Sequence, residues 1–138
     1  MAGLMMREEP GQRILKRYRT DNPYEEKVGY CRATSAGGFV FVAGTTAQGS
    51  DISDDVAEQC RSALDAIRSA LEYMGSHIDQ VLRVTYMLPD IAEFDACWPV
   101  LHDIFNGNPP AATVIECGLI DPKYRIEIEV TALQRPID

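Results

Sequence analysis

The chain has 138 residues, of which 46% are hydrophobic and 25% are charged, as is typical of one globular domain with a sizeable core. Its formal net charge of -8 disfavours binding to nucleic-acid phosphates and to anionic membrane surfaces. Residues 1–12 contain no apolar run suited to secretion or membrane insertion, so we expect a cytoplasmic protein with a loose leader there and a single domain over residues 13–138.

The first part of the domain is predicted to be mainly β-structure. Residues 12–18 favour an edge strand, and the Asp-Asn-Pro sequence at 21–23 favours a turn. Residues 30–35 and 39–43 are rich in strand-forming side chains and flank the glycine pair at 37–38, which predicts a hairpin.

One long amphipathic helix is predicted over residues 54–74. Its apolar side chains recur at spacings of three and four residues: Val56, Cys60, Leu64, Ile67, Leu71 and Met74. Ser53 is the predicted N-cap, and Gly75 is the predicted stop.

A strand over residues 81–88 and a second helix between residues 91 and 105 follow. Pro99 falls within this helix, where an interior proline costs about 3 kcal/mol or more. We therefore expect the regular helix to start late, near Asp95, so that Pro99 lies close to its first turn; a kinked helix is the alternative.

Two final strands are predicted, over residues 111–116 and 124–133. The order of strands, helix, strand, helix and strands predicts an α+β fold. Both helices then pack on one face of a mixed sheet.

The residues that commonly bind metals or form disulfides are scattered through this pattern. The four cysteines are Cys31, Cys60, Cys97 and Cys117, and none of them forms a CxxC pair. We expect reduced thiols in or near the core. The two histidines lie far apart in the sequence, so no metal site is predicted.

The last strand carries the strongest candidate for chemistry. Its alternation places Glu127 and Glu129 on the face opposite Ile126, Ile128 and Val130. If another subunit covers that acidic face, Glu127 becomes a partly desolvated carboxylate in a cleft. Such a group is suited to proton transfer.

Several segments, taken in order, resemble the RidA/YjgF family of reactive-intermediate deaminases. They are VGY, FVFVAGTTAQ, QCRSALDAIRSALEYMG, RVTYMLPDIAEFDACW, PPAAT and YRIEIEV, and they span about residues 30–133. The resemblance implies a homotrimer of the chorismate-mutase-like fold, with its helices outside and one small-molecule cleft at each subunit interface. It implies neither a metal nor an organic cofactor.

The resemblance also assigns roles to residues. Deaminases of this family hydrolyse enamine and imine intermediates to keto acids and ammonia. Glu127 matches the glutamate that orients or activates water, which makes it the catalytic candidate. Tyr30 matches a tyrosine that lines the pocket, and Gly44 matches a glycine whose backbone borders it.

Three positions depart from the family pattern. Ala112 stands where an arginine clamps the substrate carboxylate, Val114 replaces a neighbouring cysteine, and Trp98 replaces an asparagine. The clamp makes two charge-assisted hydrogen bonds, each contributing about 1.5–3 kcal/mol. Without it, binding of an amino-acid-derived imine weakens by roughly 10² or more. The chain therefore resembles a branch that lacks this arginine.

Two arginines could replace the missing clamp. Arg32 shares a strand face with Tyr30, and Arg83 lies on the central strand; each could instead pair with acids at a subunit interface. Trp98 either forms an apolar wall of the cleft or anchors the second helix in the core. Thr113 is either a pocket hydroxyl or an ordinary strand residue.

Two functions remain open from the sequence. One is a trimeric hydrolase that acts on an imine, enamine or related C–N bond, with Glu127 handling water. The other is a non-catalytic trimer that binds a small molecule or regulates through it. In both cases the expected partners are a second and third copy of the chain and a small-molecule ligand, with no nucleic acid and no membrane.

Overall fold

The computed structural model describes residues 15–134, so the predicted leader and the first residues of the predicted edge strand lie outside the described residues. Six strands form one sheet: β1 (Lys16–Tyr18), β2 (Ala33–Ala36), β3 (Phe39–Thr45), β4 (Val81–Leu88), β5 (Ala111–Glu116) and β6 (Glu127–Leu133). Their order across the sheet is β1-β2-β3-β6-β4-β5. Neighbours run antiparallel, except that β4 and β5 are parallel, so the sheet is mixed as predicted.

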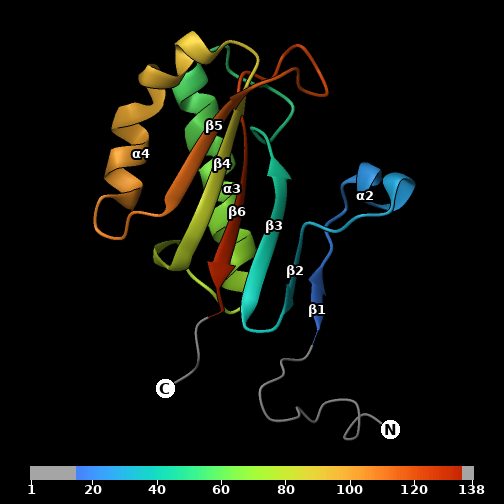
Figure 1. Cartoon of the computed structure of the whole chain (residues 1–138). Helices are drawn as coiled ribbons and strands as arrows, with labels where there is room; N and C mark the ends of the chain where they lie inside the picture. The colour runs from blue at the N-terminus through green and yellow to red at the C-terminus, as the bar shows by residue number, and fades with distance from the viewer. Residues whose placement is uncertain (1–14, 135–138) are drawn as a thin grey trace, which may run out of the picture.

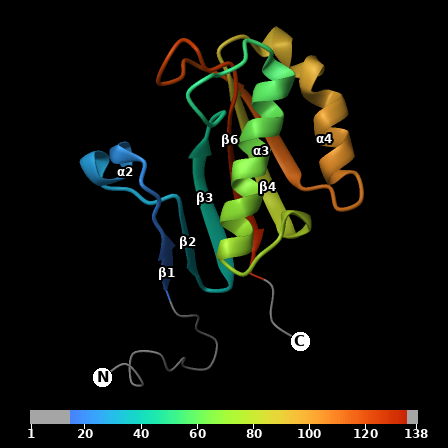
Figure 2. The same ribbon diagram turned by 180° about the vertical axis from the view of Figure 1, so that it is seen from behind.

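Two longer helices, α3 (Val56–Tyr73) and α4 (Trp98–Phe105), cover the same face of this sheet (Figures 1 and 2). The core lies between the two layers. Its fully buried side chains include Leu64, Ile67 and Leu71 from α3, and Val40, Val84 and Ile128 from the sheet. The α+β architecture predicted from the sequence is therefore confirmed.

The helix α3 begins slightly later than predicted. The side chain of Asp55 accepts a hydrogen bond from the backbone N–H of Ala57 at 3.0 Å, which makes Asp55 the N-cap. The predicted N-cap, Ser53, instead accepts a bond from the N–H of Asp55 at 3.0 Å. Gly75 follows the helix with φ +78°, a left-handed conformation that favours glycine.

The second helical segment starts late, as predicted. A 3₁₀ segment, η2 (Ile91–Cys97), precedes α4, and Pro99 lies in the first turn of α4. A backbone N–H has no intrahelical partner at that position, so proline costs little there. Regular α-helix starts at Trp98, three residues after the expected point, because η2 occupies the preceding segment.

The chain bends at Asp21, within the turn predicted at residues 21–23, but the sequence did not predict the short helix that follows, α2 (Pro23–Val28). Asn22 caps it by accepting a bond from the N–H of Tyr24 at 3.0 Å. The buried carboxylate of Glu25 accepts a bond from the N–H of Thr20 at 2.9 Å and another from the Thr20 hydroxyl. A helix of six residues is too short for the apolar periodicity that identifies longer helices.

Two predicted strands begin later than expected. The one predicted over residues 30–35 starts at Ala33, because Gly29 ends α2 in a left-handed conformation and the next three residues lead into β2. The last strand starts at Glu127 rather than at residue 124, because residues 121–125 form a loop fastened to α3.

Candidate functional site

A cleft of about 570 Å³ opens where the end of β3, the segment after α2 and the loop before β6 meet. Four residues predicted for the site line it together: Tyr30, Arg32, Gly44 and Glu127. They come from three separate segments of the chain. The sequence-based expectation that these four residues share one site is consistent with this arrangement.

Glu127, the first residue of β6, lies directly against Gly44 of β3. A Cβ atom built at Gly44 would overlap Oε2 of Glu127 and would lie 3.1 Å from its Cδ. Gly44 has no positive φ, so the backbone itself would accept another residue. The carboxylate can take up this position because Gly44 has no side chain to occupy the same space.

The electrostatics of Glu127 combine burial with opposing charges. Burial raises the pKa of this carboxyl above its ordinary value, the nearby Arg32 guanidinium opposes that rise, and Glu129 reinforces it. The net direction of the pKa is upward, so folding favours the protonated form of this carboxyl relative to a fully solvated glutamate.

Arg32 is held within the cleft by its neighbours. Its Nη2 donates a hydrogen bond to the carbonyl oxygen of Gly44 at 2.9 Å, and its Cζ lies 5.7 Å from the centre of the Tyr30 ring. Its Nε is buried and has no hydrogen-bond partner among residues 15–134. As predicted, Arg32 and Tyr30 lie together, although both precede the strand β2.

The loop before β6 forms another wall of the cleft through Lys123 and Tyr124. It is tightly folded: Asp121 accepts bonds from the N–H of Lys123, at 2.9 Å to Oδ1, and from the N–H of Tyr124, at 3.1 Å to its carbonyl oxygen. The buried amide of Gln59 on α3 holds the backbone of Lys123 and Arg125.

Sequence reasoning missed Gln59. Its available signal was a glutamine next to the apolar stripe of α3, beside Cys60. The same loop is fastened through Arg125, whose Nε and Nη2 bond the two carboxylate oxygens of Glu93 at 3.1 and 2.7 Å.

The remaining predicted site residues lie elsewhere in the chain. Ala112, Thr113 and Val114 belong to β5, and the sheet order places β6 and β4 between β5 and β3. Trp98, at the start of α4, is 59% exposed, so the alternative that it anchors the helix in the core is wrong. None of the four lines the cleft described above.

Arg83, the second candidate to replace the clamp, also lies away from the cleft. It is exposed on β4, opposite Ala111 of β5, and its Nη1 lies 3.4 Å from the Thr113 hydroxyl. Of the two arginines, Arg32 is therefore the one that lies beside Glu127 in this chain.

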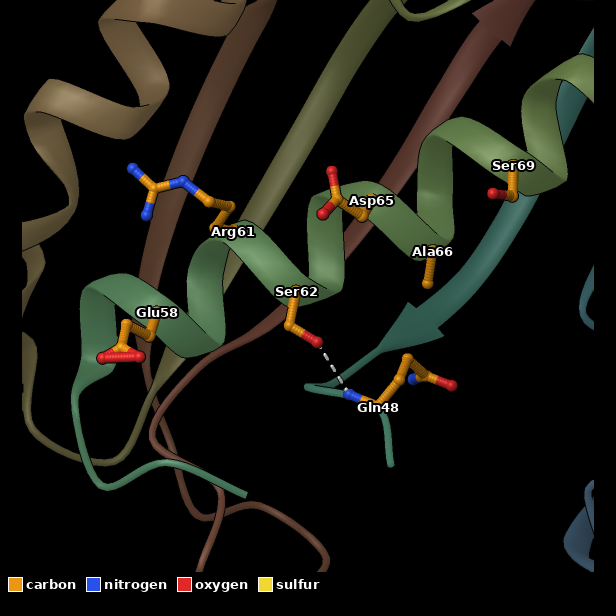
Figure 3. A pocket seen from close by; sticks show the side chains of 7 residues that line it. All are labelled: Gln48, Glu58, Arg61, Ser62, Asp65, Ala66 and Ser69. Carbon is orange, nitrogen blue, oxygen red and sulfur yellow. Dashed lines mark hydrogen bonds between the residues drawn. The ribbon is translucent and has the colours of Figure 1, made fainter. Parts of the chain in front are cut away.

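A second hollow, of about 610 Å³, runs along the outer face of α3 (Figure 3). There the Ser62 hydroxyl accepts a hydrogen bond from the N–H of Gln48 at 2.9 Å, which fastens the loop after β3 to the helix. The acids that line it, Glu58 and Asp65, are exposed to water. Exposed acids of this kind lack the desolvation that distinguishes Glu127.

The four cysteines are free thiols; Cys60 and Cys97 are buried, and Cys31 and Cys117 are partly so. Over residues 15–134 no three histidine, cysteine, aspartate or glutamate side chains gather in a way that could hold a metal ion. Within the same range no helix combines the length and apolar character needed to span a membrane.

Comparison with known proteins gives consistent matches. Residues 20–134 match the family model described as endoribonuclease L-PSP. An uncharacterised protein of Streptomyces coelicolor is 30% identical over 128 residues, which cover 90% of this chain and 96% of that protein. A RutC family protein of Pyrococcus horikoshii is 31% identical over 107 residues, which cover 75% of this chain and 85% of that protein.

A solved structure is similar as well. The crystal structure of a Mycobacterium tuberculosis member of the YjgF/YER057c/UK114 family superposes with a TM-score of 0.80 at 33% sequence identity. The match covers 86% of this chain and 98% of that one.

Proposed function

The chain belongs to the RidA/YjgF family, whose family model is described as endoribonuclease L-PSP, and on this premise we propose that it is a homotrimer whose intersubunit clefts hydrolyse an imine, an enamine or a related C–N bond. Glu127 handles the water in this reaction. The observation that carries the proposal is the contact of the Glu127 carboxylate with Gly44, beside Arg32 and inside a cleft.

The separation of the predicted site residues within one chain supports an assembly. Tyr30, Arg32, Gly44 and Glu127 line a cleft beside the inner strands β3 and β6, whereas Ala112, Thr113 and Val114 belong to the edge strand β5 and, like Trp98, do not line it. A neighbouring copy that brings its β5 to this cleft would complete a site containing both groups.

The uncovered face of the sheet supports the same conclusion. The strand pairing places several large apolar side chains on the face away from α3 and α4, and they remain exposed: Phe39, Phe41, Ile115 and Leu133. Burying such a surface against other copies of the chain removes it from water.

The proposed chemistry uses only water and the residues of the cleft. Glu127 accepts a proton from a water molecule as the oxygen attacks the carbon of the C=N bond. The acid then gives this proton to the nitrogen, which completes a carbinolamine. A second proton passes from the carbinolamine hydroxyl through Glu127 to the nitrogen as the C–N bond breaks, so that a carbonyl compound and ammonia leave. An acid with a raised pKa is suited to both transfers. Tyr30 and Arg32 orient the ligand from the same cleft.

Ala112 alters the expected substrate. It offers no side-chain donor to a carboxylate, so we propose that the substrate differs from the amino-acid imines that an arginine would clamp. Trp98, Ala112, Thr113 and Val114 of a neighbouring copy would then provide a less polar wall. Arg32 is the cation beside Glu127 that could still attract an anionic group.

The test is ammonia release from a panel of freshly generated imines. Wild type is expected to exceed the uncatalysed rate, and Glu127→Ala is expected to lose that excess. Glu58→Ala is the control, because Glu58 is an exposed acid on the outer face of α3, away from the cleft. A wild-type rate equal to the uncatalysed rate across the panel would overturn the catalytic proposal.

A non-catalytic binding or regulatory trimer is the second candidate, and Ala112 is the observation that favours it. Ligand binding without ammonia release would support this function. Ala112→Arg separates the two further: keto-acid formation from amino-acid imines should appear if only the anchor is missing.

Nuclease activity, which the family model's description suggests, would require approach of a polyanion to a chain of net charge -8. We expect purified trimer to leave added RNA intact, and gel electrophoresis of that RNA measures this. Cleavage that is abolished by Glu127→Ala would assign the same acid to a different reaction.

A further inference from the structure

Gln59 is a fully buried polar side chain, and both the nitrogen and the oxygen of its amide form hydrogen bonds. Its Nε2 donates to the carbonyl oxygens of Ser53 at 2.7 Å and of Lys123 at 3.0 Å. Its Oε1 accepts from the N–H of Arg125 at 2.8 Å. Burial of an amide is costly unless its groups are paired, and here all three partners are backbone atoms. Gln59 thus joins the start of α3 to the loop before β6.

The position of these hydrogen bonds matters because Arg125, which Gln59 holds, lies two residues before Glu127. Ile126, between them, is fully buried, and Glu127 begins the strand. Side chains alternate along a strand, so a slip of one residue would turn Glu127 to the helix-covered face. Fixing the backbone at Arg125 therefore fixes the face on which Glu127 emerges.

The hydrogen bonds of Gln59 also hold the loop before β6, which forms one wall of the cleft. Lys123, whose carbonyl oxygen is bound by Gln59, lines the cleft together with Tyr124. The ion pair between Arg125 and Glu93 fastens the loop from the side of η2, but it is partly exposed and screened by solvent. The hydrogen bonds of Gln59 are buried, so water could replace them only by entering the core.

We propose that Gln59 is a positioning residue of the cleft, which sets the carboxylate of Glu127 against Gly44 by clamping the backbone of Lys123 and Arg125 to α3. The inference rests on Glu127 being the acid of the site, as proposed above. Gln59 lies in α3 and does not line the cleft, so it acts through the loop rather than on a ligand.

The test uses Gln59→Met, which conserves volume but removes the amide. Glu127 is followed by carbon-detected NMR titration of labelled glutamate, with Glu127→Gln assigning its signal. In Gln59→Met the pKa of Glu127 should fall towards the ordinary glutamate value, because the released carboxylate gains water. Amide exchange at Arg125 should rise by about tenfold, the factor equivalent to losing one typical hydrogen bond.

Ser76→Ala is the matched control. The Ser76 hydroxyl donates to the carbonyl oxygen of Leu133 at 2.8 Å, so it fastens the opposite end of β6. This variant removes a buried side-chain bond to the same strand and should leave the Glu127 titration unchanged. A purely structural role of Gln59 would make both variants behave alike.

Gln59→Asn serves as a second variant, because it keeps the amide but withdraws it by one methylene group. It should shift the Glu127 titration in the same direction as Gln59→Met. An unchanged Glu127 titration in either folded variant would overturn the inference. The titration requires no substrate. A wild-type protein that releases no ammonia would therefore overturn the proposed function, and the Glu127 titration would still test the positioning by Gln59.

Discussion

At the scale of single residues, the position of the catalytic candidate Glu127 depends on the missing side chain of Gly44. Gly44 leaves the space that the Glu127 carboxylate occupies, and the Gly44 carbonyl oxygen also receives Arg32. The acid and the cation therefore meet at one glycine. Neither the backbone conformation nor the sequence pattern alone explains why the penultimate residue of β3 is a glycine.

Gly44→Ala should displace the carboxylate of Glu127. The added methyl group meets the mobile end of the Glu127 side chain, which can move aside. We therefore expect the unfolding free energy to fall by about 1 kcal/mol, the low end for overpacking. Imine hydrolysis should fall to the level of Glu127→Ala. Gly118→Ala is the control, because a Cβ there meets nothing within 4 Å.

The double variant Gly44→Ala with Glu127→Ala completes this experiment. The methyl group no longer meets a carboxylate, so the stability lost in the single glycine variant should be recovered in urea unfolding. A double variant in which the two losses simply add would contradict direct contact between these residues.

Glu127→Gln should stabilise the protein at neutral pH. The pKa of Glu127 is raised in the folded state, chiefly by burial, so folding favours its protonated form. Stability of the wild type therefore falls as pH rises from the ordinary glutamate pKa through the raised one. The advantage of Glu127→Gln should be present above that window and should vanish below it, as measured by denaturant unfolding at several pH values. An advantage that grows on acidification would contradict the raised pKa.

At the scale of elements, short-range capping decides where α3 begins. Both Ser53 and Asp55 can cap a helix, and the sequence favoured the first. In the structure the Ser53 hydroxyl accepts a hydrogen bond from the N–H of Asp55, and the Asp55 carboxylate accepts one from the N–H of Ala57. These two successive side-chain bonds order the segment that leads into α3. The same approach supplies the Ser53 carbonyl oxygen to Gln59.

Asp55→Ala should therefore lower the unfolding free energy by about 1 kcal/mol, the usual cost of losing an N-cap. Ser53→Ala should cost less, since its hydroxyl caps a residue outside the helix. Urea denaturation of the two variants measures the difference. A larger loss for Ser53→Ala would restore Ser53 as the effective cap.

At the scale of the whole molecule, the two faces of the sheet differ in what covers them. The helices bury one face, and the opposite face carries Phe41, 44% exposed, in register with Thr131 of β6 and next to the acidic side of that strand. This face is the surface that the proposed trimer would cover.

Phe41→Glu should dissociate the proposed trimer, because it places a charge in the proposed interface. Sedimentation equilibrium at micromolar concentration should show a single-copy particle, and imine hydrolysis should be lost with the neighbouring half-site. Ser69→Glu is the control, because it places the same charge at an exposed position on the outer face of α3, on the side of the helix away from the sheet. A wild type that sediments as a single copy would contradict the assembly itself.

Prediction from sequence succeeded where a pattern repeats. The apolar period of three to four residues located α3, and alternation located β4, β5 and the faces of Glu127 and Ile128. It failed where single contacts decide. The six-residue α2 has no period to detect, and its anchor is one buried acid, Glu25, bonded to Thr20.

The sequence by itself determined the layer order of the fold, because burying an apolar stripe and an apolar strand face leaves few arrangements. It also determined which side of β6 bears the acids, because strand alternation is local. Only the tertiary structure decided that Glu127 lies on Gly44 and that Gln59 holds the loop before it. Those contacts join residues 83 and 66 positions apart. Their geometry depends on how α3, β3 and β6 pack together, which no local pattern encodes.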